Sequence, residues 1–160
     1  MLIGGAFTKF DVSIEISGDR ADPGAITRIL GIEPTFACAK GAIRETRTGR
    51  QIAQRTGIWE LRCSYDANSG SDARDVGIAV GAFLAGLPEE PTVWREVAAL
   101  GRIVVTVTVW FEEDNGSALF EPGLFARLAT MGASLLVDVW QEAPGKGSVV
   151  PSGTDGREAV

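Results

Sequence analysis

Every second residue from Phe10 to Ile16 is apolar, and the residues between them are acids or serines. A period of two is typical of a strand that buries one face and exposes the other. Three later segments alternate in the same way: residues 57–65, 102–112 and 135–141. Residues 32–38 form a short extended segment, in which Pro34 favours the edge of a sheet because it lacks an amide donor. The pattern therefore predicts four amphipathic strands and one short edge strand.

Helical spacing of apolar residues occurs between these strands. Asp22 is a suitable N-cap, Pro23 suits the first helical position and Gly31 ends the segment, so residues 22–30 are predicted to be a helix. Helical spacing covers three further stretches: residues 76–87, 93–100 and 121–131. Glycines within the first of these weaken its helical prediction, and the second is either a separate helix or its continuation.

Two of the predicted helices begin with similar sequences. Residues 22–29 (DPGAITRI) align without a gap with residues 121–128 (EPGLFARL), and each stretch lies between two strand-like segments. We interpret these as two strand–helix–strand halves; a chance similarity of two helix starts is the alternative. The expected fold is α+β, an antiparallel sheet with helices on one face in a ferredoxin-like arrangement. Residues 1–142 would form this single domain, and residues 143–160, which lack periodicity, a disordered tail.

Composition narrows the class of protein. The 160 residues are 45% apolar and 22% charged, which fits one globular domain. The formal net charge of −6 opposes binding to duplex nucleic acid, which relies on clustered Lys and Arg. No apolar run approaches the roughly 20 residues that a membrane-spanning helix needs, and the first residues do not resemble a signal peptide. With two cysteines in the chain, these features predict a cytoplasmic protein with no membrane partner.

The chain contains no histidine. This excludes Ser-His-Asp and Cys-His nucleophile arrangements, histidine general bases and histidine-containing metal sites. The phosphate-binding motifs G-x-x-x-x-G-K-[ST] and G-x-G-x-x-G are also absent. We therefore expect no catalytic residue, metal or cofactor, and favour a non-enzymatic role.

The most conspicuous candidate site is basic. Residues 40–56 are expected to form a long loop, and only Glu45 opposes its five cations: Lys40, Arg44, Arg47, Arg50 and Arg55. Arginine pairs bidentately with carboxylate or phosphate, so the loop could bind an acidic protein surface, a phosphate or a nucleotide. The alternative is a solvated loop without a partner.

Two tryptophans form the second candidate site. By parity, Trp110 and Trp140 point away from the helices, on the outer face of the sheet. Such an exposed pair would suit a protein partner or a homodimer. The alternative is that residues 40–56 or the C-terminal tail cover the pair. The acidic turn at residues 112–114 is expected to aid solubility rather than to bind a cation.

The cysteines and Trp59 are expected to be structural. Cys38 and Cys63 do not form a C-x-x-C motif, and Cys63 shares its parity with the inward-facing Trp59 and Leu61. A buried free thiol behaves as a small hydrophobic group.

Several short motifs follow one another in a specific order: Gly18-Asp19, L-G-I-x-P-T over residues 30–35, Lys40-Gly41 and T-G-x-W over residues 56–59. Together with a closing strand in which Trp140 stands where Tyr is more usual, they resemble a bacterial family catalogued as domain of unknown function 4279. The resemblance covers residues 7–142. It implies no activity, because the family has no established one, although some similar small domains look like immunity proteins encoded beside bacterial toxins.

Two functional hypotheses follow. The first is a non-enzymatic protein-binding module, immunity-like in its role, that uses the basic loop and the tryptophans. The alternative is a small-molecule or nucleotide-binding domain, conceivably an enzyme, with a pocket that combines loop arginines with Asp138 or another acid. A homodimer formed through the outer sheet face is compatible with both.

Overall fold

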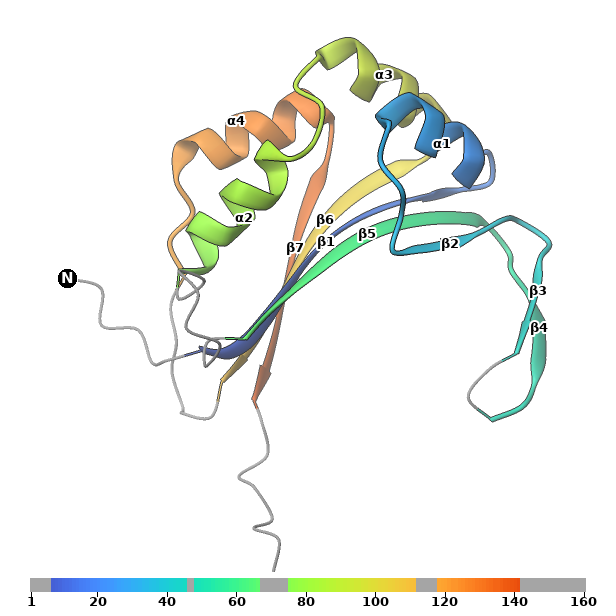
Figure 1. Ribbon diagram of the computed structural model, residues 1–160, viewed down its shortest axis with the longest axis horizontal. Helices are drawn as coiled ribbons and strands as arrows, with labels where there is room; N and C mark the ends of the chain where they lie inside the picture. Colours follow the sequence, from blue (N-terminus) through green and yellow to red (C-terminus); the bar gives the residue numbers. More distant parts are fainter. Residues whose placement is uncertain (1–6, 46–47, 67–74, 112–117, 142–160) are drawn as a thin grey trace, which may run out of the picture.

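The computed structural model describes residues 7–45, 48–66, 75–111 and 118–141, which form a five-stranded sheet, a two-stranded sheet and four helices (Figure 1). The strands are β1 (Phe7–Gly18), β2 (Phe36–Cys38), β3 (Ile43–Glu45), β4 (Gln51–Ala53), β5 (Gly57–Asp66), β6 (Arg102–Phe111) and β7 (Ser134–Gln141). The helices are α1 (Pro23–Leu30), α2 (Val76–Ala85), α3 (Pro91–Leu100) and α4 (Pro122–Met131). All four lie on one side of the larger sheet (Figure 1).

The larger sheet has the strand order β2-β5-β1-β6-β7. β5 pairs antiparallel with β2 and with β1, and β1 pairs antiparallel with β6. β7, however, runs parallel to β6, with Trp110 opposite Trp140. The sheet is therefore mixed, and the expectation of a purely antiparallel sheet is wrong. Alternation of apolar residues does not report strand direction, and α4 supplies the crossover that a parallel neighbour requires.

The two segments of similar sequence both form strand–helix–strand units. In the first unit, β5 lies between β1 and β2, whereas β6 and β7 of the second unit are direct neighbours. Both helices follow an acid and begin at a proline, and both end at a glycine of positive φ, 68° at Gly31 and 64° at Gly132. The sequence similarity therefore describes how the two helices start and stop, while their strands occupy different positions in the sheet.

The hydrophobic core fills the space between the larger sheet and the helices. The apolar positions of the alternating strands face this space, and Phe10 and Ile14 are almost fully buried. Trp59 and Trp94 are the largest fully buried side chains, and the indole N–H of each donates a hydrogen bond within the protein. Trp59 is thus the structural residue that its parity predicts.

Two local expectations are wrong. Residues 40–56 contain a hairpin in which β3 pairs antiparallel with β4, where the sequence predicts only a loop. Cys63 is exposed and Cys38 is half-buried, although the parity of Cys63 predicts burial. β2 pairs only with residues 58–60 of β5, so Cys63 lies further along β5, where β2 no longer covers the strand edge.

Some expectations concern residues outside the described part of the chain. They are Arg47, the acidic turn at residues 112–114 and the tail at residues 143–160. Among the helices that the structure does describe, none is long and apolar enough to cross a membrane.

Candidate functional site

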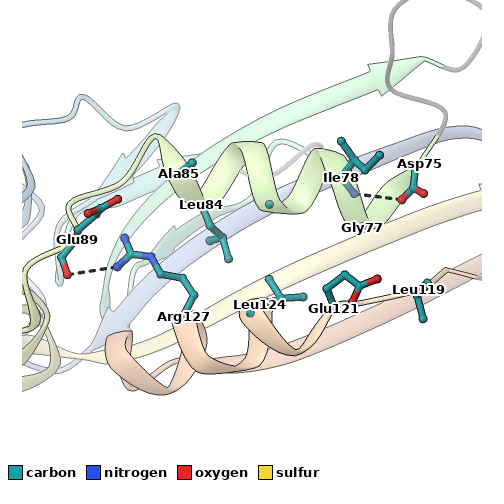
Figure 2. Close-up of a pocket in the computed structure, with 12 residues that line it drawn as sticks. Asp75, Gly77, Ile78, Leu84, Ala85, Glu89, Leu119, Glu121, Leu124 and Arg127 are labelled. Carbon is teal, nitrogen blue, oxygen red and sulfur yellow. Dashed lines mark hydrogen bonds between the residues drawn. The ribbon is translucent and has the colours of Figure 1, made fainter.

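A groove separates α2 from α4 on the helical side of the protein (Figure 2). The two helices run side by side, and the end of α2 beside Asp75 lies near the end of α4 beside Glu121 (Figure 2). The groove has a volume of about 580 Å³. This lies within the range of small-molecule sites, which is about 300–1,000 Å³.

Close contacts join the two walls at both ends of the groove. At one end, a Cβ atom added to Gly77 would lie 2.1 Å from the carbonyl oxygen of Leu119, so α2 approaches the segment before α4 closely. At the other end, Arg127 reaches from α4 to the loop after α2. Its guanidinium donates to the carbonyl oxygens of three successive residues, Leu87, Pro88 and Glu89. These contacts set the separation of the two helices.

The Arg127 side chain is itself positioned by α3. Its Cζ atom lies 6.0 Å from the centroid of the Trp94 ring. The Trp94 indole N–H also donates a 2.8 Å hydrogen bond to the Pro88 carbonyl, one of the oxygens that Arg127 contacts. The loop after α2 is therefore fastened to α3 and α4 together.

The middle of the groove has an apolar floor, and the glycines in its walls leave it unobstructed. Leu84 and Leu124 are buried beneath it, and Ile78 is exposed at its side. A Cβ atom added to Gly81 or Gly123 would meet nothing within 4 Å. A glycine inside a helix costs about 1 kcal/mol relative to alanine. Gly81 therefore lowers the stability of α2 while it keeps the groove open.

Carboxylates occupy both ends of the groove. Glu89 lies at one end, and Asp75 and Glu121 at the other (Figure 2). Among the described residues that line the groove, Arg127 is the one base, so three negative charges and one positive charge leave a formal charge of −2. Asp75 caps α2 by accepting a 3.1 Å hydrogen bond from the Ile78 amide. The carboxylates of Glu89 and Glu121 have no hydrogen-bond or ion-pair partner among the described residues.

The lining is suited to recognition. Among the described residues that line the groove, none is Ser, Thr, Cys, Lys or Tyr, so their polar side chains are carboxylates and one guanidinium. Within the described ranges, no group of three or more Cys, Asp or Glu side chains is placed to hold a metal ion. The groove offers charge and apolar surface to a ligand.

The basic residues predicted as a site lie on and around the β3–β4 hairpin. Arg44, Arg50 and Arg55 are exposed, and Arg44 stands in β3 opposite Ile52. Lys40 forms a 3.1 Å ion pair with Asp19, and both side chains are exposed. The hairpin projects from the sheet away from α2 and α4 (Figure 1), and none of these basic residues lines the groove.

Trp110 and Trp140 stand opposite each other in β6 and β7. The adjacent Val109 is buried in the core, so both tryptophans are on the other face of the sheet. That face carries no helix (Figure 1). Trp140 is exposed, whereas Trp110 is half-buried with the Lys9 ammonium 4.9 Å from its ring centroid. A second hollow, of about 390 Å³, lies beside Trp110, and its lining includes Asp11 and Asp66.

The structure does not bring the basic residues of the hairpin close to the Trp110–Trp140 pair. Lys9, beside Trp110, pairs with Asp66 at one end of β5, whereas the hairpin joins the sheet before Gly57 at the other end. At about 3.3 Å per residue, these ends are roughly 30 Å apart. Asp138 lies in β7, at the opposite edge of the sheet from β2. The described residues therefore form no pocket that combines the hairpin arginines with Asp138.

Sequence patterning does not identify the α2–α4 groove. Its walls are two helices that are distant in the sequence, and their separation depends on tertiary contacts such as those of Arg127. One signal was available: Gly77 and Gly81 are four residues apart, so they share one side of an otherwise apolar helix. In the sequence these glycines only weaken the helical prediction, whereas in the structure they line the groove.

Comparison with known proteins gives one match. No curated protein and no solved structure matches the chain. Residues 8–142 match the family model described as Domain of unknown function (DUF4279). The match spans the five-stranded sheet and both helices of the groove. The chain therefore belongs to the DUF4279 family.

Proposed function

We propose that this protein is a binding module whose α2–α4 groove holds a small organic cation with an apolar body. One observation carries the proposal: a single groove combines an apolar floor with carboxylates that have no partner among the described residues. The proposal keeps the small-molecule hypothesis drawn from the sequence but reverses the charge of the ligand, because the groove is acidic and the hairpin is basic.

The apolar part of the ligand would contact the floor and sides of the groove. Leu84 and Leu124 form the floor, and the exposed Ile78 and Leu119 side chains would be covered. Each Å² of apolar surface removed from water contributes about 25 cal/mol. An aliphatic chain of eight carbons is short enough to fit along α2, whose ten residues span about 15 Å.

The cationic group would lie at the end that carries Asp75 and Glu121. Two of the three carboxylates are there, whereas Arg127 occupies the opposite end beside Glu89 (Figure 2). The N-termini of α2 and α4 also face this end, and each carries about half a positive charge. Counted over the described lining residues, two carboxylates outweigh the roughly one positive charge of the two helix ends. Glu121 is the one of these two carboxylates that caps no helix by a hydrogen bond.

Calorimetric titration with n-octylamine and with n-octanoate tests the proposal, because the two probes share a chain length and differ in charge. We expect octylamine to bind at least tenfold more tightly than octanoate. Gly81→Leu should abolish binding by filling the groove, since a Cβ atom at Gly81 meets nothing within 4 Å. Ala82→Leu is the matched control, because Ala82 is exposed on the same helix and does not line the groove. Equal binding of both probes, or binding that survives Gly81→Leu, would refute the proposal.

A second candidate function is capture of an acidic partner protein by the β3–β4 hairpin. The supporting observation is that this hairpin projects from the sheet (Figure 1) and exposes Arg44, Arg50 and Ile43. A pull-down comparing wild type with Arg44→Glu plus Arg50→Glu would nominate partners, and calorimetry with the purified partner would follow. A purified partner that binds wild type and the double variant with equal affinity would contradict a role for the hairpin in binding.

We also propose that β2, β5, β1 and β6, with α1, α2 and α3, form a ferredoxin-like unit to which α4 and β7 are added. The supporting observation is the strand order. β5 lies between β1 and β2, which α1 connects, and β1 lies between β5 and β6, which α2 and α3 connect. An experimental structure with a different strand order would contradict this assignment.

A further inference from the structure

The two edges of the larger sheet differ in length and protection. The β2 edge is three residues long and follows Pro34, and short strands and prolines are common protection for an edge. The β7 edge is eight residues long and contains no proline, glycine or lysine, and among the described strands it pairs only with β6. A long apolar edge of this kind exposes unpaired main-chain groups that can pair with another strand.

Large apolar side chains are exposed on both faces of this edge. On the open face, Leu136 is 48% and Trp140 57% exposed; on the helical face, Val137 is 43% and Val139 58% exposed. Phe125 of α4, the helix that connects β6 to β7, is 52% exposed. Five of the nine large hydrophobic side chains exposed in the described residues are thus in β7 or α4. This concentration marks an interaction surface rather than scattered exposure.

We propose that β7 pairs antiparallel with β7 of a second copy, so that the two five-stranded sheets join into one of ten strands. A two-fold axis perpendicular to the sheet places the helices of both copies on the same side. Residues opposite each other then share a face, and apolar residues of the two copies meet on both faces. The inference is independent of the α2–α4 groove, which is lined by Gly123, Leu124 and Arg127 of α4 and not by Phe125.

Asp138, the only charged residue of β7, excludes one register of this pairing. A two-fold axis at Asp138 would place two carboxylates directly opposite each other, which destabilises strand pairing. An axis at Val137 avoids this conflict. Val137 then faces its own counterpart, and Leu135 faces Val139 on the helical side. On the open side Asp138 faces Leu136, and the Trp140 ring covers Ser134.

The expected interface is small but sufficient for a specific dimer. Main-chain pairing over seven residues, with the exposed apolar side chains, would bury on the order of 1,000 Å² in total, near the lower limit for specific interfaces. Each copy carries a net charge of −6, so the two copies repel at long range. The dimer should therefore become tighter as salt screens this repulsion.

Sedimentation equilibrium of the full chain, at low and high salt, tests the dimer, and cysteine cross-linking tests its register. In a Cys38→Ser plus Cys63→Ser background, Val137→Cys should cross-link efficiently with a short bifunctional thiol reagent. Val139→Cys is the register control: its counterpart would lie four residues along the partner strand, roughly 13 Å away. Val137→Lys should raise the dimer dissociation constant at least tenfold, because two ammonium groups would face each other. Ala98→Lys, at an exposed position of α3, should leave it unchanged.

Three results would overturn the proposal. The first is a monomer at every concentration whose β7 amides exchange rapidly with solvent. The second is a monomer whose β7 amides are protected, which would mean that another segment of the same chain covers the edge. The third is a dimer that cross-links at residue 139 rather than 137, or that Val137→Lys does not weaken.

Discussion

The indole N–H of Trp59 donates a 3.0 Å hydrogen bond to the hydroxyl of Thr27, which joins β5 to α1. Trp59 belongs to T-G-x-W, one of the short motifs that carry the family resemblance, and Thr27 lies three residues before another, L-G-I-x-P-T. Thr35, from the first motif, donates to the Glu60 carbonyl at 3.1 Å and accepts from the Arg62 amide at 3.0 Å. These residues hold α1 and β2 against β5, so this part of the resemblance has a structural role.

Replacing Thr27 with valine should destabilise the protein by about 1–2 kcal/mol, because the buried indole N–H of Trp59 would lose its acceptor. Urea unfolding followed by tryptophan fluorescence measures this change. Thr130→Val is the matched control, since the Thr130 hydroxyl bonds only to the Ala126 carbonyl at an exposed position of α4. Equal losses in the two variants would show that the Trp59 bond contributes nothing of its own.

Gly57→Ala should destabilise the protein by about 3 kcal/mol or more, since overpacking against rigid backbone is costly. A Cβ atom at Gly57 would lie 1.7 Å from the carbonyl oxygen of Ala21. Gly123→Ala should change stability by less than about 1 kcal/mol, because its Cβ atom meets nothing within 4 Å. Thermal unfolding by circular dichroism compares the two variants. A stable Gly57→Ala protein would contradict the close approach of β5 to the turn before α1, where Ala21 lies.

Tyr65, the only tyrosine, should titrate above its ordinary pKa of 10.0. Burial raises the pKa of Tyr65, and Cys63 raises it further through charge repulsion and a side-chain hydrogen bond. Ultraviolet absorbance of the phenolate measures it without interference from other tyrosines. Cys63→Ala should lower the Tyr65 pKa partway towards 10, leaving the larger effect of burial.

The direction of this shift also predicts an alkaline loss of stability. Because the folded protein raises the Tyr65 pKa, the stability linked to this group is fully present below pH 10. It is lost as the pH rises from 10 through the folded pKa, since the unfolded chain then releases its proton more readily. Urea unfolding between pH 9 and 11 checks this, with Tyr65→Phe as the control. A Tyr65→Phe protein with the same alkaline loss would assign that loss to other groups.

Much of the fold follows from local patterns in the sequence. The alternation from Phe10 to Ile16 predicts β1 and its buried face, and Gly31 and Gly132 mark the ends of α1 and α4. These features depend on neighbouring residues alone. The direction of β7 does not, because a strand of the same pattern can pair in either direction. The β3–β4 hairpin was also missed, since strands of three residues give too few positions for a period of two.

The candidate site was harder to predict than the fold. The charge of residues 40–56 makes the hairpin the obvious candidate in the sequence. The groove, however, depends on how the contacts of Arg127 and Gly77 place α2 and α4 relative to each other. Its carboxylates, Glu89 and Glu121, are ordinary surface acids in the sequence. Only their tertiary position, around one apolar floor, makes them candidates for recognition.

The most direct test of the groove as a cation site compares n-octylamine with 1-octanol, which has the same chain but no charge. Calorimetry should show that wild type prefers the amine by at least fivefold. Glu121→Gln should remove most of this preference without weakening octanol binding, whereas Glu89→Gln, at the Arg127 end, should largely keep it. A preference that survives Glu121→Gln, or wild-type protein that binds amine and alcohol equally, would contradict the central claim.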